Sequence, residues 1–106
     1  MKMYRQGDVL LVETKLASDA QLKELPRDGK DRIVLAYGET TGHAHAITNR
    51  VARFFEEAGT DRWLLVVPEE TELVHEEHAP VKVEVGVYIV IHQHEYHPAE
   101  IRPVVD

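Results

Sequence analysis

The chain has no cysteine among its 106 residues, which excludes disulfide bonds, thiolate metal ligands and cysteine nucleophiles. Ser18 is the single serine and stands in a helix-cap context, so a Ser-His-Asp triad is not expected. A glycine-rich phosphate-binding loop is also missing. Because no apolar run is long enough for a signal peptide or a membrane span, we expect a cytoplasmic location and no membrane partner.

Acidic residues outnumber basic ones by 19 to 12, and the formal net charge is −7. A phosphate backbone would be repelled by this charge, so we expect no nucleic-acid partner. What the chain has in excess is histidine, with seven residues. These imidazoles are the main candidates for any chemistry.

The apolar residues fall into short runs separated by turn residues. A chain of this length predicts one domain, spanning residues 1–106. The spacing of the runs predicts an all-β fold, an antiparallel barrel or sandwich of about seven or eight strands. We expect the strands over residues 9–12, 32–37, 43–48, 51–56, 62–67, 71–75, 81–85 and 87–96, with a hairpin formed by the third and fourth. Residues 18–25 are compatible with one or two helical turns.

The segment "TGHAHAI" places His43 and His45 two residues apart in a predicted strand. Alternate residues of a strand point to the same face, so both rings project together. Two such imidazoles can bind one ion at the usual Zn–N distance of ~2.1 Å. An HxH pair also occurs often by chance at the exposed end of a strand.

The segment "HEEH" supplies His75 and His78 as the candidates for the remaining ligands. Pro80 follows closely, which indicates that this segment leaves its strand through a turn that can aim one or both rings inward. Glu76 or Glu77 can supply a carboxylate ligand or a hydrogen bond to a ligand histidine. The predicted metal site is therefore His43, His45, His75 and His78, for a divalent ion such as Zn, Fe, Ni or Mn, with no organic cofactor.

A second HxH pair lies near the C-terminus, where His92 and His94 are followed by His97. These residues offer a rival or separate site. Their polar neighbours are typical of a solvated strand end, so a structural role is favoured there.

The linked motifs "RQGDVLL", "AYGETTGHAHAI", "HEEHAPV" and "YHPAEIRPV" resemble a family of small uncharacterised bacterial and phage-associated proteins. The resemblance covers nearly the whole chain and implies no activity. It draws attention to the residues that match its motifs, namely Tyr37, Gly38, Thr41, Gly42, His43, His45, His75, Glu76, Glu77 and His78.

A weaker resemblance is to the cupins, which are small β-barrels with a Gly…HxH motif followed by a glutamate. Gly42, His43 and His45 fit this motif, whereas residues 46–50 contain no glutamate. The histidine of the second cupin motif would correspond to His75 or His78.

Three functions remain open from the sequence. The first is a β domain that binds a divalent metal, with an open coordination position if the protein is an enzyme. The second is a non-enzymatic interaction or accessory module whose histidines are structural. The third is an assembly element that responds to pH through its histidines. A small-molecule or protein partner and homo-oligomerisation are compatible with all three.

Overall fold

The computed structural model describes residues 1–38 and 42–93, and in these ranges it contains ten β-strands and no helix. The strands are β1 (Met3–Gln6), β2 (Val9–Thr14), β3 (Leu22–Glu24), β4 (Ile33–Tyr37), β5 (Ala44–Ile47), β6 (Arg53–Glu57), β7 (Trp63–Val67), β8 (Thr71–His75), β9 (His78–Val83) and β10 (Gly86–His92). No helix in these ranges is long and apolar enough to cross a membrane.

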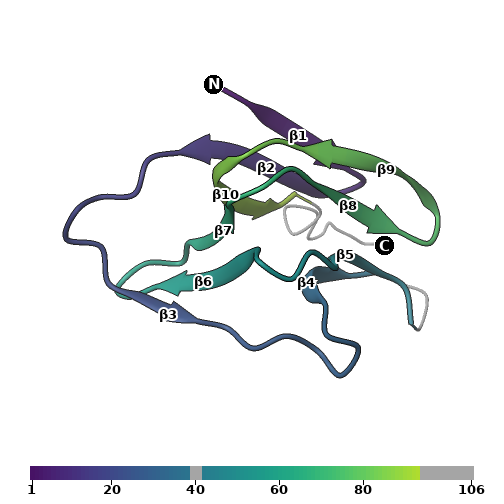
Figure 1. The fold of residues 1–106 in the computed structure, drawn as a ribbon, viewed down its shortest axis with the longest axis horizontal. Helices are drawn as coiled ribbons and strands as arrows, with labels where there is room; N and C mark the ends of the chain where they lie inside the picture. The colour runs from purple at the N-terminus through teal and green to yellow at the C-terminus, as the bar shows by residue number, and fades with distance from the viewer. Residues whose placement is uncertain (39–41, 94–106) are drawn as a thin grey trace, which may run out of the picture.

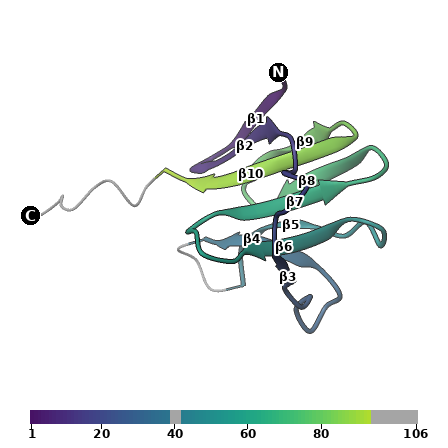
Figure 2. The same ribbon diagram turned by 90° about the vertical axis from the view of Figure 1, so that its left-hand side faces the viewer.

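The strands form two antiparallel sheets that face each other as a sandwich (Figures 1 and 2). The larger sheet has the order β1-β2-β10-β7-β6-β3, and the smaller sheet has the order β4-β5-β8-β9. The two sheets meet along one side, where β1 lies against β9. The predicted all-β class is confirmed, in its sandwich form rather than as a closed barrel.

The core lies between the sheets and follows the alternation of the strands. Leu11, Leu65 and Tyr88 from the larger sheet and Ile47 and Leu73 from the smaller sheet have no exposed surface. Each such side chain contributes about 1.5–3 kcal/mol on burial. The alternating positions of the central strands therefore explain why the short apolar runs fold as strands.

Two local predictions are wrong. Residues 18–25 form no helical turn, because Leu22–Glu24 pairs with β6 as a strand. The third and fourth predicted strands, β5 and β6, do not form a hairpin, because they belong to different sheets. The chain between β5 and β6 crosses from one sheet to the other, which apolar patterning alone does not distinguish from a hairpin turn.

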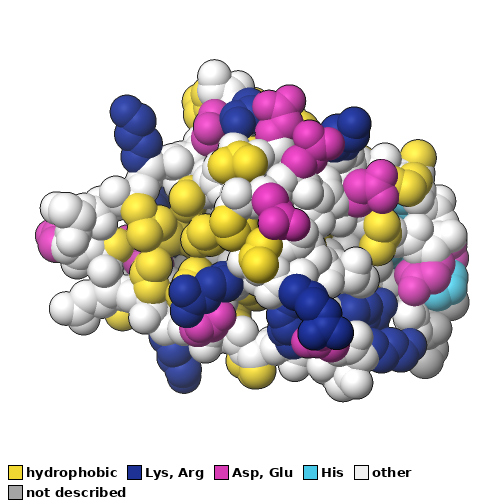
Figure 3. Space-filling view, viewed as in Figure 1, with side chains coloured by type: hydrophobic (Ala, Val, Ile, Leu, Met, Phe, Trp, Pro, Cys, Tyr) yellow, Lys and Arg dark blue, Asp and Glu magenta, His cyan; other side chains and the backbone are white. Residues whose placement is uncertain are grey.

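The segment between β2 and β3 crosses the outer face of the larger sheet (Figure 2). Leu64 is 1% exposed although its neighbour Leu65 occupies the core, so the outer face is apolar as well. Figure 3 shows hydrophobic side chains gathered over β2, β10, β7 and β6. Apolar residues on both faces explain the continuous runs in these central strands.

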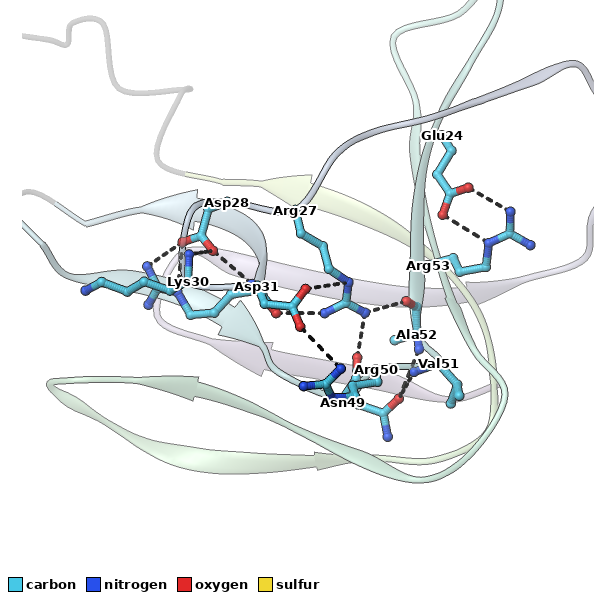
Figure 4. A network of polar contacts seen from close by, with 11 residues as sticks. Glu24, Arg27, Asp28, Lys30, Asp31, Asn49, Arg50, Val51, Ala52 and Arg53 are labelled. Carbon is cyan, nitrogen blue, oxygen red and sulfur yellow. Dashed lines mark hydrogen bonds and ion pairs between the residues drawn. The ribbon is translucent and has the colours of Figure 1, made fainter.

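A polar network joins the two chain segments that cross between the sheets near β3 and β4 (Figure 4). The Arg27 guanidinium donates hydrogen bonds to the carbonyl oxygens of Asn49 and Ala52, at 2.6 and 2.8 Å, and to that of Asp31 at 3.0 Å. Asp31 has a positive φ of 61°, in the left-handed region that Asp and Asn tolerate better than most residues. Arg27 thus ties the β3–β4 connection to the β5–β6 connection.

Candidate metal centre

The "HEEH" segment forms the tight turn of the β8–β9 hairpin. β8 ends at His75 and β9 begins at His78, so Glu76 and Glu77 are the two loop residues. The pairing sets His75 directly opposite His78, after a register shift that follows Leu73. The hairpin therefore brings together two rings that an uninterrupted strand would send to opposite faces.

β5 supplies the third ring of a histidine triad, His45, His75 and His78. The ring centroids lie 4.3 Å apart for His45 and His75, 4.7 Å for His75 and His78, and 5.4 Å for His45 and His78. One ligand nitrogen from each residue lies within 4.8 Å of the other two. Histidine side chains reach the surface beside acidic ones at the right of Figure 3, over the β8–β9 turn.

His45 is the buried member of the triad, with 4% of its surface exposed, and Gln6 determines its tautomer. Gln6 Nε2 donates to the carbonyl oxygens of Leu73 and Ala79, both at 2.9 Å. Because a carbonyl only accepts, the amide oxygen of Gln6 must be the atom that faces His45 Nδ1, at 2.8 Å. His45 Nδ1 therefore carries the proton, and in the neutral ring Nε2 carries the lone pair.

The environment also keeps His45 neutral. Burial, with a smaller contribution from the charges of His75 and His78, lowers its pKa from 6.5 to about 4. Neutral imidazole is the form that coordinates metal ions. At neutral pH the His45 ring is thus uncharged, with its proton on Nδ1 and its lone pair on Nε2.

Two glycines make room for the triad. A Cβ atom at Gly7 would lie 3.0 Å from His78 Nε2 and 3.1 Å from His45 Cε1. A Cβ atom at Gly38 would lie 3.0 Å from His75 Nε2. Gly7 also has a positive φ of 58°, so any other residue there would be strained as well as crowded.

His43, predicted to act with His45, lies just before β5 and outside the triad. Its ring centroid is 5.8 Å from that of His75. Its Nδ1 is 2.8 Å from Glu77 Oε2, an ion-pair distance when the ring is protonated. The two atoms are not aligned for a hydrogen bond, and this buried nitrogen has no hydrogen-bond partner in the described chain. The structure therefore gathers three of the four predicted ligands and leaves His43 beside them.

The two glutamates of the turn, Glu76 and Glu77, make different contacts. Glu76 Oε1 accepts a hydrogen bond from the Ala44 amide at 2.9 Å, and this bond is the largest cause of the lowered pKa of Glu76. The Glu77 amide donates to His75 Nδ1 at 3.0 Å. Glu76 thus fixes the hairpin against β5, whereas Glu77 contacts both His43 and His75.

Of the C-terminal histidines the structure describes only His92, which lies outside the triad. His92 lies at the end of β10, where its Nε2 donates to the Leu35 carbonyl oxygen at 2.7 Å and its ring centroid lies 5.3 Å from that of Trp63. His94 and His97 lie outside the described residues.

Sequence reasoning missed Gln6, which is 3% exposed and makes three hydrogen bonds around the triad. In the sequence Gln6 stands out only within the "RQGDVLL" motif, and β1 is not among the expected strands. A polar residue followed by glycine is an ordinary turn signal. The contact of Gln6 with His45 depends on the packing of β1 against β9, which the local sequence does not predict.

A search of curated proteins and a search of solved structures both found no match. The family described as "Domain of unknown function (DUF8820)" matches residues 5–93, which include the whole histidine triad and Gln6. Because the match covers more than half of the chain, this protein belongs to the DUF8820 family.

Proposed function

We propose that this domain binds a divalent transition-metal ion through His45, His75 and His78. The observation that carries the proposal is the hydrogen bond from His45 Nδ1 to Gln6 Oε1. Metal-binding histidines in proteins almost always donate their other N–H group to an oxygen in this way. His45 Nε2 is accordingly the ligand atom.

The chemistry of the donor set favours zinc and its neighbours. Imidazole nitrogens suit Zn, Cu, Fe and Ni, whereas Mg and Ca prefer oxygen. Ligand atoms of a tetrahedral zinc ion lie ~3.4 Å apart at Zn–N distances of ~2.1 Å. The present separations of up to 4.8 Å require the rings to move by about 1 Å, and the exposed position of His78 permits this movement.

Three nitrogen ligands leave a coordination position for water or another oxygen donor, as in catalytic zinc sites. Glu77 of the turn is a candidate for a fourth protein ligand, since its carboxylate lies beside His43 and its amide contacts His75. His43 would form an ion pair with that carboxylate or would itself coordinate the metal ion.

Metal binding would break one specific hydrogen bond. The Glu77 amide donates to His75 Nδ1, so the neutral ring carries its proton on Nε2. A metal at Nδ1 displaces the amide, and a metal at Nε2 moves the ring proton to Nδ1. In both cases the bond is lost, so the backbone amide of Glu77 reports directly on the site.

Calorimetric titration of the untagged, chelator-treated chain with Zn²⁺, Ni²⁺, Fe²⁺ or Mn²⁺ tests the proposal. We expect at least one of these metals to bind at one ion per chain, and this binding to be lost in His45→Ala. In NMR spectra recorded with Zn²⁺, we expect the amide resonance of Glu77 to shift. His92→Ala is the matched control, because His92 is a partly buried histidine outside the triad, and it should retain binding. No binding of any of these ions, or undiminished binding by folded His45→Ala, would exclude the site.

The alternative is an accessory module whose histidines are structural. It is supported by the partners that the triad already has: Gln6 for His45 and the Glu77 amide for His75. Under this alternative, His45→Gln lowers the free energy of unfolding while added metal leaves the melting temperature of the unmodified chain unchanged. A metal-dependent rise in melting temperature distinguishes the two, because a ligand that binds only the folded state stabilises it.

A further inference from the structure

We infer that the cleft beside Trp63 and His92 binds a small, uncharged, aromatic molecule. The cleft has a volume of about 420 Å³ and is lined by Leu25, Val34–Tyr37, Phe54, Trp63 and His92. Pockets for small molecules typically measure ~300–1,000 Å³. None of the triad histidines lines the cleft, so this inference does not depend on metal binding.

The cleft lies where the sandwich is not closed by strand pairing. β4 is an edge strand of the smaller sheet, and β6, β7 and β10 of the larger sheet face it without a hydrogen-bonded ladder. On the opposite side of the sandwich, β1 and β9 meet and Gln6 bridges them. The topology thus leaves one side of the core accessible and seals the other.

His92 and Leu35 keep the two walls of the cleft in a defined position. His92 Nε2 donates to the Leu35 carbonyl oxygen, which links the end of β10 to β4 across the opening. Leu35 stands at the register shift between β4 and β5, at the point where the strand departs from regular pairing. Trp63 packs against the His92 ring with an interplanar angle of 40°. The cleft is therefore braced by a specific bond.

The lining determines the class of ligand. Tyr37, Phe54 and Trp63 contribute three aromatic rings, and no lining residue within the described ranges carries a carboxylate, ammonium or guanidinium group. An ionic ligand would lose its hydration without gaining a counter-charge. An aromatic ligand gains offset or edge-on ring contacts in addition to apolar burial. Tyr37 is 69% exposed, so it stands at the entrance.

Two fluorescent probes with the same ring system test this charge selectivity. N-phenyl-1-naphthylamine is uncharged, and 8-anilino-1-naphthalenesulfonate adds one negative charge to the same skeleton. We expect the uncharged probe to bind at one saturable site, with energy transfer from Trp63, the single tryptophan. The sulfonated probe should bind about tenfold more weakly, a difference of about 1.4 kcal/mol.

Three variants test the position of the site. Val34→Phe enlarges a half-buried lining residue and should weaken the uncharged probe at least about tenfold, whereas Val51→Phe, at an exposed valine outside the lining, should not. Tyr37→Lys changes only an exposed side chain and should raise the affinity for the sulfonated probe relative to the uncharged one.

Three results with the full chain would each overturn the inference. These are the absence of saturable binding of the uncharged probe, equal binding of both probes, or an unchanged probe ratio in Tyr37→Lys. Probe binding that is absent in the full chain and present after removal of residues 94–106 would assign the cleft to the chain's own C-terminal residues and overturn it equally.

Discussion

Gln6 and Arg27 each link separate parts of the sandwich, on opposite sides of it, through similar hydrogen bonds. Gln6 links β1 to β8 and β9, and Arg27 links the β3–β4 connection to the β5–β6 connection. Each side chain donates two hydrogen bonds to backbone carbonyl oxygens more than twenty residues away in the sequence. Gln6 is neutral and buried, and its remaining acceptor holds His45. Arg27 is charged, its side chain is 21% exposed, and it contacts no histidine of the triad.

This difference explains why the Gln6 bridge orients a histidine and the Arg27 bridge does not. A buried amide has both donors and an acceptor, so satisfying the carbonyl groups of β8 and β9 leaves the oxygen aimed at a third element. A guanidinium has donors only and cannot orient an imidazole N–H group. The side with the amide therefore has a histidine of fixed tautomer, and the other side has a purely structural bridge.

The largest expected effect is that of Gln6→Leu. This change leaves the Leu73 and Ala79 carbonyl groups and the His45 N–H group without their partner, and we expect a loss of about 3 kcal/mol in the free energy of unfolding. Urea denaturation measures it, with exposed Gln21→Leu as the matched control. A loss below about 1 kcal/mol, the net contribution of a single hydrogen bond, would mean that Gln6 is not the bridge described here.

Acid should destabilise the metal-free chain through His45. Its pKa is 6.5 when unfolded and about 4 in the fold, so the unfolded state binds more protons between these values. The contribution of His45 to stability is therefore full above pH 6.5 and is lost as the pH falls through 4, by about 3 kcal/mol in total.

The comparison with His45→Gln isolates this contribution. Denaturation at pH 7.5, 6.5, 5.5 and 4.5 in a chelator should show a stability difference between the two chains that shrinks as the pH falls. Glu13, Asp28 and Glu76, whose pKa values are lowered from 4.5, 3.8 and 4.5, lose their contributions at more acidic pH. A difference that does not change with pH would contradict the neutral state of buried His45.

The sequence predicted the strands and the turn that carry the histidines of this site better than it predicted the contacts between them. Strand positions follow from apolar runs, and the turn in "HEEH" follows from its distance to Pro80. Strand alternation also predicted that His43 and His45 share a face, but β5 begins only at Ala44, so the rule does not extend to His43. Gln6 could not be predicted, because its role depends on the contact between β1 and β9, which are more than seventy residues apart at Gln6 and Ala79.

Arg27→Leu should have a moderate effect. Its hydrogen bonds to Asn49 and Ala52 are short but partly accessible to solvent, so we expect a loss of about 1.5 kcal/mol in the free energy of unfolding. Metal affinity should be unchanged, in contrast to Gln6→Leu. If Arg27→Leu weakens metal binding as strongly as Gln6→Leu does, the two sides of the sandwich are not independent.

The smallest change in the free energy of unfolding is expected for Arg53→Ala. This variant tests whether the burial of a side chain's hydrogen bonds, rather than their number, determines its contribution to stability. Arg53 makes two bonds to the Glu24 carboxylate, at 3.0 and 2.7 Å, and its guanidinium lies 5.2 Å from the Phe55 ring centroid. Both partners of the ion pair are about half exposed, and exposed pairs contribute little because water competes for each group. We expect an unfolding midpoint equal to that of the unmodified chain at 0.15 M salt. A loss as large as that of Arg27→Leu would mean that the β3–β6 edge depends on this pair, and that burial is not what distinguishes the bridging side chains of this fold.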